Sequence, residues 1–346
     1  MDNYYDLGDY QRSITSDHPD AQTWFNRGLV WCYAFNHEEA VRCFEKVTQI
    51  DPECAMGYWG MAYATGPFYN KPWAWYGEQE RVEAIAFCHE YAYRAAALKD
   101  RASPVERALI DALCRKFSKP RAKHAAVLEN RLHAFADAMR GVYEQFSDDL
   151  DVICLTAEAL VNLTPWKLWN LQLGIPAEEA ATVEAIGILE AGLDIVACRN
   201  LKPHPGILHF YIHVYEMSPA PVTALPFAGQ LRHLCPEAGH LLHMPSHIDS
   251  LCGQWQDAAD ANDRAIAADR KYLGLRGTDE FYMISVVHNY KFKIWASMFL
   301  GQYREALAAA DAICDLVRDK RLIADKWYLA STMDGYYAGR AHVLVR

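Results

Sequence analysis

The chain has 346 residues and a formal net charge of -10, and hydrophobic residues make up 52% of it. This apolar share can bury a large core, which excludes intrinsic disorder. An excess of acidic residues, 44 against 34 basic ones, argues against a nucleic-acid partner. No apolar stretch is long enough to span a bilayer, and the first residues lack a signal-peptide pattern. We therefore expect a cytoplasmic protein without a membrane partner.

The ten cysteines are scattered along the chain without a C-x-x-C pair. Most of them occupy positions that fit the apolar face of a helix, whereas small secreted proteins space their cysteines in compact frameworks. We therefore expect free, buried thiols rather than disulfides.

Helical periodicity is almost continuous, and the alternating pattern of strands is scarce. The first regular stretch starts at Ala21 and fits the tetratricopeptide pattern, which spans roughly 34 residues. Its matching positions are Trp24, Gly28, Trp31, Ala40, Phe44 and Pro52. A second copy starts at Ala55 and loses the register in the segment 66–73. The sequence thus predicts regular repeats near residues 21–66.

Residues 74–200 are predicted to form less regular helices. Ser103 and Glu106 have the spacing of a capping box, with Pro104 at the first helical position. A further apolar helix is predicted over 152–163, after Asp149 and Asp151. No linker divides this stretch from its neighbours.

The repeat pattern returns near residues 205–272 and 287–320, in copies that start at Pro205, Gly239 and Val287. Such repeats pack side by side as helical hairpins. We therefore predict an all-α fold, a tetratricopeptide-like superhelix (α-solenoid) that forms one domain over residues 1–346 and curls around a concave, His-rich site.

Six of the fourteen histidines lie in three short segments, 209–216, 240–248 and 287–290. In the first two segments the spacing places the polar residues on one face of a helix. In the repeat register they occupy positions 2, 5, 9 and 12, a stripe that lines the concave groove in proteins that this repeat resembles. The predicted groove residues are His209, His213, Glu216, His240, His243, His247 and His288. A weaker frame adds Glu158 to the same surface.

A cluster of imidazoles is costly to bury unless something binds it, so we predict a metal site formed by the six histidines. Nitrogen ligands with one or two carboxylates suit copper, iron, zinc or nickel better than magnesium or calcium. Because six histidines exceed the ligands of one closed site, two metal ions are an alternative to one ion with outer supporting residues. An acid-base or anion-binding cluster remains a second alternative. Pro245 should kink its helix, and Met244 should pack in the core.

Several motifs resemble those of a bacterial and fungal family of tetratricopeptide-type proteins. They are FNHEEA (35–40), GPFYN (66–70) and HLLHMPSHI (240–248). The resemblance implies an all-helical fold over most of the chain and implies little about the reaction. Asn36 and His37 belong to this pattern, but helix capping is an adequate explanation for them.

The favoured function is a metal-dependent enzyme that acts on a small-molecule substrate, with copper or iron as an oxidoreductase or oxygenase centre. Glu216 or Glu158 would serve as a further ligand or catalytic proton acceptor. One alternative is a zinc-dependent hydrolase or lyase. The alternative of another class is a non-enzymatic interaction scaffold that binds a protein partner through the repeat groove.

Overall fold

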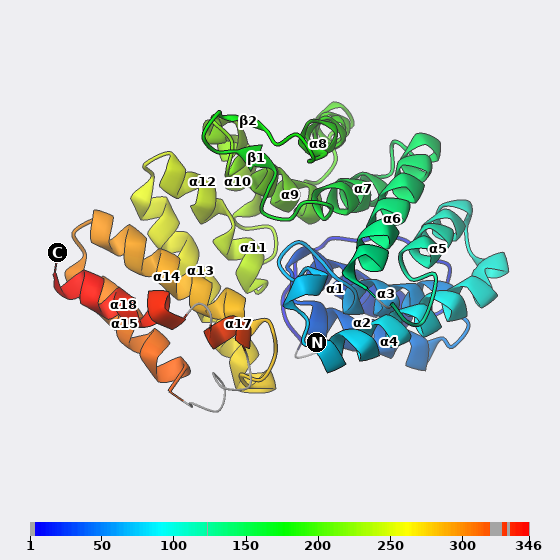
Figure 1. The fold of residues 1–346 in the computed structure, drawn as a ribbon, viewed down its shortest axis with the longest axis horizontal. Coiled ribbons are helices and arrows are strands. Elements are labelled where there is room, and N and C mark those ends of the chain that lie inside the picture. Colours follow the sequence, from blue (N-terminus) through cyan, green and yellow to red (C-terminus); the bar gives the residue numbers. More distant parts are fainter. Residues whose placement is uncertain (1–3, 123, 319–326, 331–332, 346) are drawn as a thin grey trace. The chain divides into compact units, whose positions relative to one another are not determined.

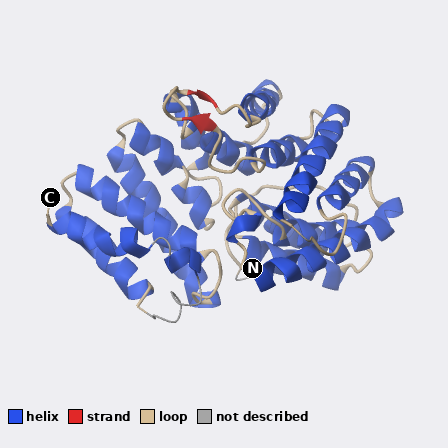
Figure 2. Ribbon diagram, in the orientation of Figure 1, coloured by secondary structure: helices blue, strands red, loops and turns tan. Residues whose placement is uncertain are grey.

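The computed structural model describes residues 4–122, 124–318, 327–330 and 333–345. Helices make up nearly all of the regular structure in these residues, which confirms the all-α prediction (Figure 2). A short antiparallel hairpin, β1 (Trp169–Asn170) with β2 (Ile175–Pro176), was not predicted. Residues 319–320, at the end of the last predicted repeat region, lie outside the described residues.

The chain forms two compact units. Unit 1 combines Met1–Gly8 with Ala220–Arg346, and unit 2 comprises Asp9–Pro219. Compactness does not decide whether the two units fold independently, so the single domain over 1–346 stays a prediction.

Unit 2 begins with a helical hairpin that matches the first predicted repeat. Its helices are α1 (Pro19–Tyr33) and α2 (His37–Ile50), which pack on α3 (Ala55–Thr65) (Figure 1). Asn36 caps α2, because its side-chain oxygen accepts a hydrogen bond from the backbone N–H of Glu39 at 3.2 Å. A side chain at Gly28 would begin 2.6 Å from the Phe44 ring, so only glycine allows this close approach of α1 and α2.

The rest of unit 2 confirms both predicted helix starts. Ser103 and Glu106 form the capping box in front of α5, and the Asp149 side chain accepts hydrogen bonds from two backbone N–H groups at the start of α7. The helices of unit 2 that follow α3 are, in chain order, η1 (Trp73–Trp75), α4 (Glu78–Leu98), η2 (Lys99–Arg101), α5 (Pro104–Lys116), α6 (Ala125–Gln145), α7 (Leu150–Val161), α8 (Thr182–Cys198) and α9 (Pro205–Tyr215).

The segment before α1 is held to unit 2 by buried polar contacts. The Arg12 guanidinium contacts Asp149 at 2.7 Å and Asp151 at 2.8 Å. Farther along, the backbone N–H of Thr15 donates to Glu106 at 2.7 Å. Burial opposes ionisation of Asp151, but Arg12 and His204 outweigh it and hold the pKa of this carboxyl below its usual range. Arg12 and Thr15 therefore connect the segment before α1 to α7 and α5.

Unit 1 contains the predicted kink at Pro245. The helix divides there, because α11 ends at His243 and α12 begins at Pro245, whose missing N–H cannot continue the hydrogen-bond ladder. Met244 is fully buried between them, as predicted. The elements of this unit are η3 (Pro221–Ala224), α10 (Leu225–Leu231), α11 (Gly239–His243), α12 (Pro245–Leu251), α13 (Trp255–Arg276), α14 (Met283–Phe299), α15 (Tyr303–Leu316), α17 (Trp327–Ala330) and α18 (Met333–Leu344).

All ten cysteines are free thiols, which confirms the absence of disulfides. Six of them are buried and Cys198 is exposed, so burial was predicted correctly for most but not all of them. Among the described helices, none is both long and apolar enough to cross a membrane.

Candidate metal centre

Three imidazoles of unit 1 converge on one point. His243 ends α11, His247 lies in α12, and His288 reaches them from α14. The Nε2 atom of His247 lies 2.9 Å from Nε2 of His243 and 3.3 Å from Nε2 of His288. One ligand nitrogen from each ring lies within 4.8 Å of the other two. We refer to His243, His247 and His288 as the trihistidine site.

Asn262 of α13 determines which nitrogen of His243 faces this point. The Asn262 side-chain N–H donates to the carbonyl of Ala258 at 2.8 Å, which assigns the other end of the amide as oxygen. That oxygen lies 2.7 Å from Nδ1 of His243, so Nδ1–H donates to it. The lone pair of His243 is therefore on Nε2, the atom that faces the other two rings.

Hydrogen bonds alone do not satisfy all three Nε2 atoms of the trihistidine site. Nε2 of His243 can only accept, so a proton on Nε2 of His247 would be needed between them. Nε2 of His288 also faces Nε2 of His247, and one N–H group cannot donate a full hydrogen bond to both neighbours. A cation between three lone pairs removes the conflict. For metal–nitrogen bonds of roughly 2.0–2.1 Å, tetrahedral ligands stand about 3.3 Å apart, close to the observed spacing.

The trihistidine site is only partly enclosed by its surroundings. The ring of Phe292 packs on all three imidazoles, with centroid distances of 4.9, 4.6 and 4.8 Å. His243 is fully buried, whereas His247 and His288 are half-buried. Three nitrogen ligands at a partly buried site suit a metal ion that keeps a position for water or a further ligand.

A second buried polar group of unit 1 includes His240. The backbone N–H of His240 donates to the hydroxyl of Tyr282 at 3.1 Å, and this hydroxyl donates to Asp269 at 2.9 Å. Asn289, next to His288, donates to the other oxygen of Asp269 at 2.7 Å. Burial raises the pKa of Asp269 to about 7, although these two hydrogen bonds oppose the shift.

Sequence reasoning missed the two buried polar residues of α13. Asn262 and Asp269 are seven residues apart, so they lie on the same face of the helix, whose other buried residues are mostly alanines. Both are fully buried. A polar pair on an apolar helix face is a signal that could have marked both residues as members of buried polar clusters.

The other predicted group lies in unit 2, on α9. His209 and His213 have ring centroids 4.7 Å apart, and Phe35 packs on both. Nδ1 of His209 lies 2.6 Å from the carbonyl oxygen of Tyr33, and Nδ1 of His213 lies 2.7 Å from the carboxylate of Glu216. Both rings thus donate through Nδ1 and carry the lone pair on Nε2. Glu216 orients His213, as carboxylates do beside metal-binding histidines.

Glu158 is part of a different buried cluster in unit 2. Its carboxylate accepts hydrogen bonds from Tyr63 and from Asn162, and Lys116 lies close enough to lower its pKa. Burial nevertheless outweighs these contacts and raises the pKa of Glu158. Its catalytic role stays a prediction, and so does the placement of all the predicted site residues on one concave surface.

One comparison with known proteins supports a tetratricopeptide repeat near the start of the chain. Residues 21–54 match the family model of the tetratricopeptide repeat, a span that includes most of α1 and all of α2. A solved structure, the C-terminal part of a TPR repeat-containing protein from Cytophaga hutchinsonii, is similar with 12% identity and a TM-score of 0.39. The likeness covers 87% of this chain and 98% of that one. No curated protein matches the chain.

Proposed function

We propose that this chain is a tetratricopeptide-type interaction scaffold that holds a transition-metal ion at the trihistidine site. The scaffold role is supported by the repeat at residues 21–54, because stacked helical hairpins of this kind commonly bind other proteins. This support favours the non-enzymatic alternative over the metalloenzyme that the histidines first suggested.

The metal ion is supported by one observation, the convergence of three Nε2 atoms in unit 1. Imidazole nitrogens suit zinc, copper, nickel and iron, and the short hydrogen bond from His243 to Asn262 is the kind of outer contact that orients a ligand ring. We propose zinc as the first ion to test, because three nitrogens at a partly buried site match its coordination habits.

Titration calorimetry with zinc chloride on chelator-treated protein tests the metal ion. We expect saturable binding in unit 1, and we expect the double variant His243→Ala, His247→Ala to lose it. The matched control is His233→Ala, which removes an exposed histidine of the same unit. Equal zinc binding by the double variant and by the control would remove the metal from the proposal.

A random peptide library displayed on phage tests the scaffold role. We expect enrichment of sequences that bind the folded protein with one-to-one stoichiometry in calorimetry. A library that yields no saturable binder under conditions where the protein is folded would count against a scaffold, whatever the outcome of the zinc titration.

The finer prediction of a copper or iron oxidoreductase or oxygenase has no support from the comparisons, and neither has a small-molecule substrate. Both remain proposals that depend on the metal. Optical and paramagnetic spectra of the purified protein, loaded with one metal at a time, distinguish them from zinc chemistry, since zinc gives no such signals.

A further inference from the structure

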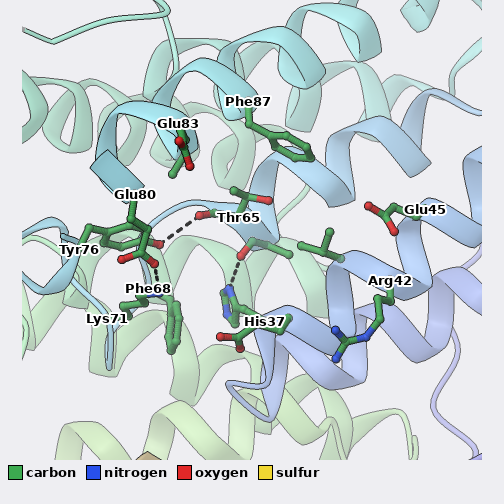
Figure 3. A pocket seen from close by; sticks show the side chains of 14 residues that line it. His37, Arg42, Glu45, Thr65, Phe68, Lys71, Tyr76, Glu80, Glu83 and Phe87 are labelled. Carbon is green, nitrogen blue, oxygen red and sulfur yellow. Dashed lines mark hydrogen bonds and ion pairs between the residues drawn. The ribbon is translucent and has the colours of Figure 1, made fainter. Parts of the chain in front are cut away.

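Unit 2 has a pocket of about 490 Å³ that the histidine pattern did not point to (Figure 3). It is lined by α2, the end of α3, the connection 66–77 and α4. Figure 3 shows Phe87 and Glu83 entering from α4, while Arg42 and Glu45 enter from α2. The volume lies within the range of roughly 300–1,000 Å³ that is usual for ligand sites.

The pocket exists because the repeat is interrupted. Residues 34–36 connect α1 to α2, whereas the whole segment 66–77 connects α3 to α4. This longer connection supplies Phe68, Lys71 and Tyr76 to the pocket wall. Phe68 and Lys71 exchange backbone hydrogen bonds of 3.3 and 2.9 Å, and the Tyr76 hydroxyl donates to the carbonyl of Thr65 at 3.0 Å. The wall is therefore preformed, which lowers the entropic cost of binding.

His37 adds a neutral, flat surface to this wall. Its ring stacks on Phe68 with a centroid distance of 3.8 Å and an interplanar angle of 17°. Nδ1 lies 2.8 Å from the carbonyl oxygen of Ala64. Burial lowers the pKa of His37 to about 3, so the ring carries no charge near neutral pH and does not repel a cation.

The charges of the pocket leave two carboxylates for a ligand. Lys71 pairs with Glu80 at 2.6 Å, and Arg42 pairs with Glu39 at 2.8 Å, so both cations of the pocket have acidic partners inside the protein. Within the part of the chain that the structure describes, Glu45 and Glu83 form no ion pair, although Glu83 accepts a hydrogen bond from a glutamine side chain. Glu38 is a further lining carboxylate.

We infer that this pocket binds a lysine or arginine side chain of a partner polypeptide. The inference rests on the proposed scaffold function and names the chemistry of its partner. The aliphatic stem of such a side chain would pack on an aromatic ring of the lining, such as Phe87, while its charged end would meet Glu45 or Glu83. A free organic amine has the same charged group, but an amine without a polypeptide gains no contacts along the rim of the pocket.

Fluorescence anisotropy with a labelled peptide tests the inference. The probe is an eight-residue peptide of alternating lysine and alanine, and the comparison peptide carries glutamate in place of lysine. We expect the lysine peptide to bind and the glutamate peptide not to bind. The double variant Glu45→Gln, Glu83→Gln should weaken lysine-peptide binding by about tenfold, since each ion pair is partly exposed to solvent.

The matched control is Glu90→Gln, which neutralises an exposed carboxylate of α4 outside the pocket. Lysine-peptide binding that falls equally in the control and the double variant would reflect overall charge and would overturn the pocket. No binding of the lysine peptide to the folded protein would also overturn it. The scaffold itself would survive either result if library peptides of other composition still bind.

Butylamine as a competitor distinguishes the two sources of the charged group. We expect millimolar butylamine to displace the lysine peptide only weakly, because it lacks the rim contacts. Butylamine that binds as tightly as the peptide would overturn the assignment to a polypeptide partner.

Discussion

The two histidine groups share a helical spacing but have different surroundings. His209 and His213 in unit 2 are separated by four residues, as are His243 and His247 in unit 1. In unit 2 the rings are buried beside Phe35, and their Nδ1 atoms meet a backbone carbonyl and a carboxylate. In unit 1 a third ring, His288, arrives from another helix and faces the first two. In unit 1 two of the three rings come from α11 and α12, on either side of the break at Pro245, and the packing of α14 supplies the third.

The largest expected effect is the loss of this third ligand. His288→Ala should weaken zinc binding in unit 1 by about 100-fold or more, because two imidazoles remain where three converged. His213→Ala should leave the affinity of the trihistidine site nearly unchanged. Competition of each variant with a zinc-sensitive dye measures both values, and comparable losses in the two variants would break the distinction between the groups.

The aromatic partner of each group should differ in its effect on stability. Phe35→Ala is expected to lower the free energy of unfolding by about 3–5 kcal/mol, because Phe35 is fully buried and the substitution leaves a cavity. Phe292→Ala should have a smaller effect because its ring is half-buried. Urea unfolding followed by circular dichroism gives both numbers. Equal destabilisation would mean that Phe292 supports unit 1 as strongly as Phe35 supports unit 2.

A substitution of Asn262 isolates the hydrogen bond that orients His243. Asn262→Leu should lower zinc affinity by roughly 10- to 100-fold, the usual effect of losing such an outer contact. Asn262→Asp keeps an acceptor for Nδ1–H and serves as the control, so it should keep most of the affinity. Calorimetry on both variants, after circular dichroism has shown that they are folded, decides. A similar loss in the two variants would point to disturbed packing of α13 instead.

Each unit contains one buried group whose titration should change the free energy of unfolding. The two contributions change in opposite directions as the pH rises. Asp269 has a pKa near 7 in the folded protein and near 4 in an unfolded chain, so its contribution favours folding less as the pH rises from 4 to 7. His37 has a pKa of about 3 when folded and near 6.5 when unfolded, so its contribution favours folding more as the pH rises from 3 to 6.5. Each slope is at most about 1.4 kcal/mol per pH unit.

Variants measured against the wild type separate these two contributions from all others. The stability of Asp269→Asn relative to wild type should increase as the pH rises from 4 to 7. The stability of His37→Gln relative to wild type should increase as the pH falls from 6.5 to 4. Urea midpoints over this range test both slopes, and a difference that stays constant with pH would show that the group does not titrate as described.

Local signals in the sequence predicted the helices well. The capping box at Ser103 and the break at Pro245 depend on residues within one helical turn, so a linear pattern contains all that is needed. The first repeat was equally clear, because small residues such as Gly28 must recur where helices cross closely.

The candidate site was predictable only in part. The pattern predicted His243, His247 and His288 as metal ligands; the structure brings these three side chains together, and their role as ligands stays a prediction. Asn262, the partner of His243, comes from α13, and the choice of Nδ1 or Nε2 depends on which polar atom packs against each ring. Such contacts arise from tertiary packing, which the spacing of residues along one helix does not contain. The pocket beside α4 also depends on tertiary packing, here of the longer connection 66–77. No sequence motif therefore predicted it.

The segment ahead of the first repeat limits how far this protein can be treated as a set of modules. A fragment that starts at α1 would leave Asp151 without the charge of Arg12 and Glu106 without its contact to Thr15. Asp151 would keep its contacts with His204 and Tyr33, but the loss of the guanidinium from a buried ion pair is destabilising. The helices of unit 2 therefore depend on residues that precede the first repeat. A fragment of this unit, or a design that reuses its helices, needs to include those residues.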